Sequence, residues 1–258
     1  MARIVDLSMP IDDHFRWPVE RAQAGDLAAG DTFQVTRLGW TVHGFTHIDA
    51  PRHMVPGGPT TSEVALDKTV GPAAVIDLSG IAPETEITAE ALAGNGAHLE
   101  AGDIAIVKTC WDQARSPHTP AFWTEAPYLS AAACRWLLAR GIKALGVDFP
   151  QDYPIRLLLE GKRAPIAEFV SHDILLRNGV ILIEYLCNLG ALQGPRTTLF
   201  ALPLKVPRRR RRAGPRHRLR IRRQRSGIRY QKPTRLSLIP DTWHLTSDMM
   251  RSASYHGD

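Results

Sequence analysis

With 258 residues, of which 44% are hydrophobic and 22% charged, the chain has the composition of a soluble globular protein that can bury a core. No apolar run approaches the roughly 20 residues of a membrane-spanning helix, and the absence of a C-x-x-C pair among Cys110, Cys134 and Cys187 argues against a disulfide framework or a thiolate zinc site. The net charge of +6 is unevenly distributed: residues 207–258 contain fourteen Arg and one Lys against three Asp, a net of +12, so residues 1–206 carry −6 and show no basic surplus for nucleic acid.

Along the chain, short strands are mixed with two amphipathic helices. Runs rich in β-branched and aliphatic residues predict strands at 4–8, 33–43, 73–79, 103–109, 144–149, 180–186 and 199–206. One helix is expected over 130–140, with Ser130 as its N-cap and Gly141 just past its end, and a second over 168–179. Strands and helices do not alternate strictly, so we predict an α/β fold with a mixed sheet and a few helices rather than a doubly wound sheet.

After Val206 the sequence changes character. The stretch PRRRRRAGPRHRLRIRRQR has no apolar periodicity and cannot bury a core. We therefore expect one domain over 1–206 and an Arg-rich tail over 207–258. The tail has three open interpretations: a basic arm for nucleic acid or anionic surfaces, an inert solvated tail, and an out-of-frame translation. The last is favoured because LFALPLKVP breaks off where a strand looks unfinished.

Residues 43–53, HGFTHIDAPRH, hold three histidines and an aspartate at the spacing H-x3-H-x-D-x3-H. Imidazole nitrogen and carboxylate oxygen are ligands for zinc and similar cations. In an extended segment His47 and Asp49 point the same way, and His43 can fold in from the preceding turn. His53, beyond the proline, stays available as a base. A histidine-rich surface loop is the alternative, but four metal-competent residues in eleven favour a metal site.

A second pair of residues supports this interpretation. Glu184 lies within VILIEYL, whose neighbours are nearly all apolar, and a buried carboxylate is costly unless it is paired or bound to metal. The alternative is that Glu184 faces solvent or pairs with an arginine. His172 lies on the preceding predicted helix, and the helix, the Asn-Gly turn and the strand together can bring both side chains to one place.

Together these segments resemble the metal-dependent cyclase family, which includes bacterial kynurenine formamidase (arylformamidase) and isatin hydrolase. The family motif H-x-G-T-H-x-D-x-P-x-H is similar to residues 43–53, with Phe45 in place of the usual glycine. The other matching positions are Asp6-Leu7-Ser8, Gly146-Val147-Asp148, His172 and Glu184. The resemblance covers residues 4 to about 206.

The resemblance implies a swivelling β/β/α cyclase-type fold, a homodimer or larger assembly, and zinc or manganese as cofactor, one or two per chain. The ligands that it implies are His43, His47 and Asp49 for a first metal and Asp49, His172 and Glu184 for a second. His53 would be the catalytic acid/base.

The implied activity is that of an amidohydrolase in which metal-activated hydroxide attacks a formamide or cyclic amide. The reference reaction converts N-formylkynurenine to kynurenine and formate in tryptophan catabolism. One alternative is an isatin hydrolase-like or other lactam or carbamate hydrolase. Another is an inactive metal-binding protein with a basic, nucleic-acid-binding tail.

Two aromatic residues are candidates for contact with the small-molecule substrate. Trp17 could stack on an aromatic ring, with plain packing as the alternative, and Phe45 would narrow or reshape the pocket. We expect no membrane partner, and nucleic acid to bind only non-specifically through the tail. The N-terminus reaches Asp6 before any apolar stretch of signal-peptide length, so we expect a cytoplasmic protein.

Overall fold

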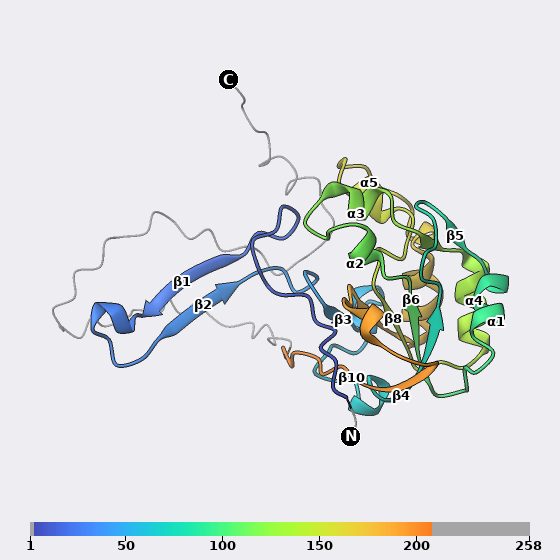
Figure 1. Cartoon of the computed structure of the whole chain (residues 1–258), viewed down its shortest axis with the longest axis horizontal. Helices are drawn as coiled ribbons and strands as arrows, with labels where there is room; N and C mark the ends of the chain where they lie inside the picture. Colours follow the sequence, from blue (N-terminus) through green and yellow to red (C-terminus); the bar gives the residue numbers. More distant parts are fainter. Residues whose placement is uncertain (1–2, 208–258) are drawn as a thin grey trace. The chain divides into compact units, whose positions relative to one another are not determined.

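The computed structural model describes residues 3–207 and is built on a six-stranded sheet (Figure 1). Its strands, in spatial order, are β10 (Arg196–Phe200), β4 (Val70–Asp77), β6 (Ile104–Lys108), β8 (Ala144–Val147), β9 (Ile181–Glu184) and β3 (His47–Asp49). The four strands from β4 to β9 run parallel, and the edge strands β10 and β3 are antiparallel to their neighbours. This mixed sheet confirms the predicted α/β class.

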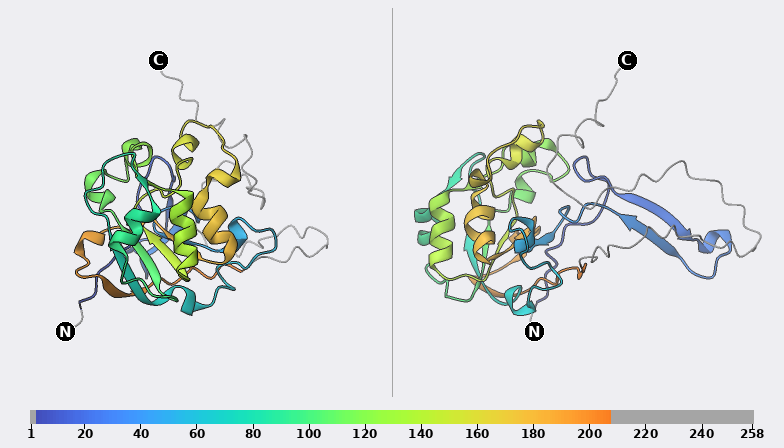
Figure 2. Two further views of the ribbon diagram at one scale, coloured as in Figure 1. Left: turned by 90° about the vertical axis from the view of Figure 1, so that its right-hand side faces the viewer. Right: turned by 180° about the vertical axis from the view of Figure 1, so that it is seen from behind.

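Side-chain alternation buries both faces of the sheet. In β6, Ala105 belongs to one cluster of buried apolar residues and Ile106 to the other. Helices α1 (Ala89–Asn95) and α4 (Ala131–Ala139) cover the first face, where Leu137 is fully buried (Figures 1 and 2). Strands that are buried on both faces read as continuous apolar runs, which explains why the central strands were predictable.

Smaller elements surround this sheet. Strands β1 (Glu20–Gly25) and β2 (Val35–Gly39) form an antiparallel hairpin that extends away from the sheet, and β5 (Glu86–Ile87) pairs with β7 (Tyr128–Leu129) (Figure 1). The short α-helices are α2 (Trp111–Ala114), α3 (Pro120–Thr124) and α5 (Ile155–Leu158). The short helical turns are η1 (Leu27–Ala29), η2 (Pro51–His53), η3 (Leu66–Lys68), η4 (Ile166–Glu168), η5 (Ser171–Leu175), η6 (Leu176–Asn178) and η7 (Leu189–Ala191).

The predicted helix over 130–140 is confirmed, including both ends. The Ser130 hydroxyl accepts a hydrogen bond from Ala133 N at 3.0 Å, which satisfies one of the free amides of the first turn. Gly141 follows with a φ of +72°, in the left-handed region where glycine ends a helix without strain.

Other predicted elements differ from the structure. The segment 4–8 forms no strand in the described chain, although Leu7 O accepts a hydrogen bond from Cys187 N at 3.0 Å. The predicted strand 33–43 ends at Gly39, because a turn closed by Gly44 N and Thr41 O bends the chain. The strand predicted at 199–206 lies earlier, because Phe200 is already opposite Val70, the first residue of β4.

The helix predicted over 168–179 is also wrong in type. It divides into the turn η4, the π-helix η5 and the 3-10 turn η6. Ser171 N donates to Asp152 Oδ1 at 2.7 Å, so a side chain from another segment takes the place of a helical carbonyl. Single π-turns often occur at functional sites.

Three further predictions concern the cysteines, membrane-spanning helices and the Arg-rich tail. Cys134 is buried, Cys110 and Cys187 are half-buried, and all three are free. No helix among residues 3–207 is long and apolar enough to cross a bilayer. Residues 208–258 lie outside the described part, so the proposed Arg-rich tail and its boundary stay predictions.

The cap of α4 gives a direct stability test. We expect Ser130→Ala to lower the free energy of unfolding by about 1 kcal/mol, because the Ala133 amide loses its acceptor. Ser130→Gly should lower it by only a few tenths of a kcal/mol, roughly the usual ratio for N-caps. Urea unfolding checks both, and equal losses in the two variants would contradict the capping role.

Candidate metal centre

The edge strand β3 places two candidate ligands beside β9. In the antiparallel register His47 lies opposite Glu184, and opposed residues project side by side from one face. His47 Nε2 is accordingly 3.6 Å from Glu184 Oε2. Asp49, two residues further along, shares that face, with Oδ1 at 3.4 Å from His47 Nε2. The sheet register therefore builds half of the cluster.

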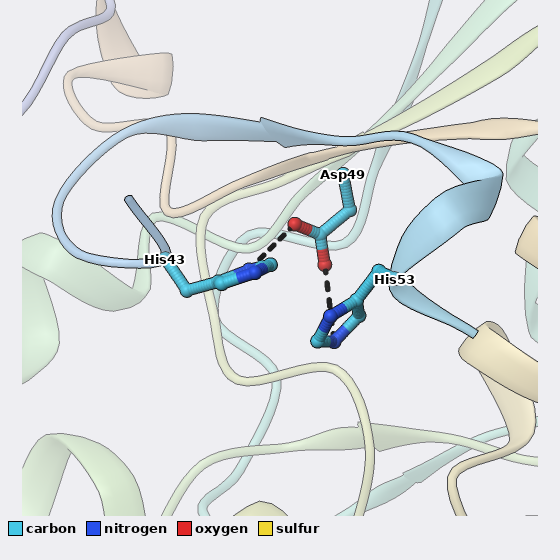
Figure 3. A group of neighbouring side chains, drawn as sticks. All are labelled: His43, Asp49 and His53. Atoms are coloured by element: carbon cyan, nitrogen blue, oxygen red, sulfur yellow. Dashed lines mark ion pairs between the residues drawn. The ribbon is translucent and has the colours of Figure 1, made fainter. Parts of the chain in front are cut away.

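Three further histidines reach the carboxylate of Asp49, which is 1% exposed. Nδ1 of His43 lies 2.8 Å from Oδ1, and Nε2 of His53 lies 3.7 Å from Oδ2 (Figure 3). Nε2 of His172 is 3.5 Å from Oδ2. His53 ends the turn η2, which begins at Pro51, so the proline directs the chain back toward Asp49.

Glu184 faces the same point from the sheet. The residue is 4% exposed, and Oε1 lies 3.5 Å from Nε2 of His172. Its side chain therefore does not face solvent. Its described contacts are histidines, a glutamine and a tyrosine, and the charge of Arg16 also acts on it. All five residues predicted as ligands thus converge, although their role in metal binding stays a prediction.

The buried atoms at the centre lack hydrogen-bond partners. Among residues 3–207, His47 Nε2 and both Asp49 oxygens are buried with no aligned hydrogen bond, although imidazole nitrogens lie 2.8–3.7 Å from those oxygens. Burial raises the pKa of Asp49, but the imidazoles of His172, His43 and His47 close to its oxygens hold that pKa well below its usual value. An ionised, buried carboxylate needs a partner, so these residues fit a divalent cation.

Two overlapping sets of ligand atoms meet the spacing of a metal site. They are His43, Asp49 and His53, and His47, Asp49 and Glu184, with the atoms of each set within 4.8 Å of one another. Mixed imidazole and carboxylate donors suit zinc or manganese. Because Asp49 belongs to both sets, one or two metals can be accommodated. The geometry also makes His53 a candidate ligand, in addition to its predicted acid/base role.

The site is open on the side of two histidines. The side chains of His43 and His53 are 42% and 37% exposed, whereas that of His47 is 8% exposed. Desolvation lowers the pKa of His53 to about 4. The charge of Asp49 acts to raise this pKa, and the neighbouring imidazoles lower it further. His53 is therefore neutral at pH 7 and has a nitrogen lone pair free for a cation or a proton.

Sequence analysis missed two residues behind the site, Gln151 and Asp152. Asp152 Oδ2 accepts a hydrogen bond from His172 Nδ1 at 2.6 Å, and the Gln151 amide nitrogen donates to Glu184 Oε1. Both follow the buried strand β8, at the carboxyl end of a parallel strand, where sites gather in α/β sheets. That position was the available signal.

A cavity of about 1110 Å³ borders the cluster. His43 and His53 line it together with apolar residues such as Ile48 and Leu186, a mixture that suits a substrate with an apolar body and a polar reacting group. Trp17 lies outside this lining: it is 5% exposed and packs among aromatic rings. Its predicted contact with substrate stays a prediction, and in this structure its neighbours are those of a core residue.

Phe45 borders the same cavity, but its ring is buried. The residue is 1% exposed, with ring centroids 5.2 Å from Trp17 and 5.8 Å from His14. Its φ is +60°, a left-handed conformation that strains any residue with a Cβ and that glycine adopts freely. This φ gives a physical reason for the glycine of the family motif, and aromatic packing offsets the strain here.

Comparison with known proteins agrees with this geometry. The family model Cyclase, described as "Putative cyclase", matches residues 5–151, which include His43, His47, Asp49 and His53. The chain is 27% identical to a kynurenine formamidase of Bacillus cereus over 209 residues, covering 78% of this chain and 90% of that protein. It is 26% identical to a kynurenine formamidase of Erythrobacter litoralis over 178 residues, or 69% and 73% of the two chains.

Solved structures with a similar fold are also metal-dependent hydrolases or isatin hydrolases by their names. Isatin hydrolase A from Labrenzia aggregata superposes with a TM-score of 0.64 at 25% identity, over 80% of this chain and 88% of the other. A potential metal-dependent hydrolase with cyclase activity superposes with a TM-score of 0.58 at 27% identity, over 79% and 90%.

The strain at Phe45 can be measured with two substitutions. Both Phe45→Ala and Phe45→Gly lose buried ring contacts, a loss of roughly 3–5 kcal/mol in the free energy of unfolding. Only glycine relieves the left-handed φ, so Phe45→Gly should be the more stable of the two by about 1 kcal/mol. Chemical denaturation checks this order, and an alanine variant as stable as the glycine variant would contradict the strain.

Proposed function

The chain belongs to the Cyclase family, and on that premise we propose that it is a metal-dependent hydrolase of C–N amide bonds of the arylformamidase type. The reaction that we propose is hydrolysis of N-formylkynurenine to kynurenine and formate, as a step of tryptophan catabolism. The observation that carries the metal dependence is the buried Asp49 carboxylate, which has histidine nitrogens around it and no aligned hydrogen bond.

Each residue of the cluster has a task in this proposal. His43, His47 and Asp49 would hold a first metal, and Asp49, His172 and Glu184 a second, if two are bound. When bound, zinc or manganese lowers the pKa of a coordinated water and polarises the amide carbonyl. The neutral His53 ring, on the open side, would accept the proton of the attacking water and return it to the leaving nitrogen.

A second candidate activity is the opening of a cyclic amide, as named for isatin hydrolase. The superposition on isatin hydrolase A, with a TM-score of 0.64, favours it. A cavity of about 1110 Å³ with apolar walls has room for a bicyclic lactam as well as for an aryl formamide. Carbamates are a further substrate class to test.

The remaining parts of the proposal concern the setting of the reaction. We propose a homodimer or larger assembly that acts in the cytoplasm on a small-molecule substrate. If the tail over 207–258 binds nucleic acid, that binding should disappear on its deletion while amide hydrolysis by the domain persists. A metal-binding protein without catalysis is the competing outcome.

The substrate class is tested by a panel of amides with and without metal. We expect hydrolysis of N-formylkynurenine, isatin or a related amide, lost after chelation and restored by zinc or manganese, because in this proposal the metal activates the attacking water. Product formation is followed by absorbance. Full activity in metal-free protein would contradict the proposal.

The role of His53 is tested by substitution. As acid/base, His53→Ala should lower kcat by roughly 10²–10⁴-fold while the metal content per chain stays unchanged. If His53 is instead a ligand, metal is lost as well. His98→Ala is the matched control. His98 forms a hydrogen bond with Val75 O in β4, which contains none of the candidate ligands, so this variant should keep normal turnover. Normal turnover by His53→Ala would overturn the assignment.

A further inference from the structure

We infer that Gln151 and Asp152 are positioning residues that aim Glu184 and His172 at the metal. The inference rests on the proposed function, because it assigns these two residues a task toward the same site. Neither residue belongs to the predicted ligand set, and both are fully buried, at 0% and 1% exposure.

The two residues stand on a fixed piece of backbone. They follow β8, and their main-chain carbonyls accept hydrogen bonds from Leu129 N at 2.8 Å and from Ile155 N at 3.0 Å. The backbone is therefore held from β7 on one side and by its own turn into α5 on the other. A side chain that projects from such a position has little freedom to follow a moving partner.

Asp152 controls the histidine. Its carboxylate accepts hydrogen bonds from Ser171 N and Oγ, both at 2.7 Å, and from His172 Nδ1 at 2.6 Å. With Nδ1 committed to Asp152, Nε2 is the nitrogen left to face the metal on the opposite side of the ring. That atom lies 3.5 Å from both Asp49 Oδ2 and Glu184 Oε1. A carboxylate behind a histidine ligand fixes its tautomer and raises its basicity.

Gln151 controls the glutamate. Its amide nitrogen donates to Glu184 Oε1, and the other oxygen, Oε2, is left 3.6 Å from His47 Nε2. The amide oxygen of Gln151 is buried without a partner in the described chain, so the side chain is oriented for its contact with Glu184 rather than for a full set of hydrogen bonds.

Gln151 and Asp152 thus hydrogen-bond to Glu184 and His172, the two predicted ligands that lie outside β3 and its adjoining loops. The contacts of Asp152 with Ser171 also support the π-helix, so a purely structural role must be separated from a role toward the metal. A double-mutant cycle distinguishes the two roles. Substituting a positioning residue weakens metal binding only while the ligand that it positions is present.

The experiment is a double-mutant cycle on zinc affinity with the full-length chain. Dissociation constants are measured by competition with a chromophoric chelator for the wild type, Asp152→Asn, His172→Ala and the double variant. We expect Asp152→Asn to weaken zinc binding by about 10–100-fold in the wild-type background and by less than about twofold beside His172→Ala. The same cycle with Gln151→Met and Glu184→Gln should show the same pattern.

A control and a spectroscopic readout complete the test. Ser171→Ala removes one hydrogen bond from Asp152 and the longer contact of Ser171 Oγ with His172 Nδ1, at 3.3 Å, but keeps the 2.6 Å bond between Asp152 and His172. It should therefore change zinc affinity by much less than Asp152→Asn. Imidazole 15N spectra should show His172 protonated at Nδ1 in the wild type and a changed pattern in Asp152→Asn.

The outcomes separate the two proposals. Zinc binding by the wild type with equal effects of Asp152→Asn in both backgrounds would overturn the positioning role alone. A folded wild type that binds neither zinc nor manganese would overturn the proposed function and this inference with it.

Discussion

Histidine nitrogens approach the carboxylate of Asp49 to within 2.8–3.7 Å, yet neither oxygen has an aligned hydrogen bond. A buried anion in that situation is unfavourable by itself, and a cation among the same atoms removes the penalty. The surroundings of Asp49 are consistent with this requirement, because they provide a second carboxylate, Glu184, and the imidazoles of His43, His47, His53 and His172. The site is thus arranged around one buried carboxylate, whose low pKa depends on the imidazoles beside it.

The fold positions the residues of the candidate site in two ways. The antiparallel pairing of β3 with β9 sets His47 beside Glu184, so the strand register of an edge strand fixes the distance between two ligands. Behind them, the parallel strand β8 ends at a polar pair that contacts His172 and Glu184. The sheet therefore places candidate ligands at its edge, and the residues that contact two of them lie beyond the carboxyl end of a parallel strand, where sites gather in α/β sheets.

What the sequence predicted was local. The central strands and the helix capped by Ser130 follow from apolar runs and end signals, and the HGFTHIDAPRH segment holds four candidate metal ligands within eleven residues. What it did not predict depends on contacts distant in sequence. Asp152 becomes meaningful only when the fold brings Ser171 and His172 to it, at the start of the segment that forms a π-helix in place of the expected α-helix. The left-handed φ of Phe45 is likewise invisible in a residue that normally avoids it.

The central claim, that Asp49 anchors a divalent metal, is tested most directly by elemental analysis of the full-length protein, purified without an affinity tag or chelator. We expect one or two equivalents of zinc or manganese per chain in the wild type. Asp49→Asn should lose them, and Asp148→Asn should keep them, because that buried carboxylate already accepts hydrogen bonds from Thr109 and Cys110. A folded wild type that stays metal-free when zinc or manganese is offered, or an Asp49→Asn variant that retains its metal, would contradict the account.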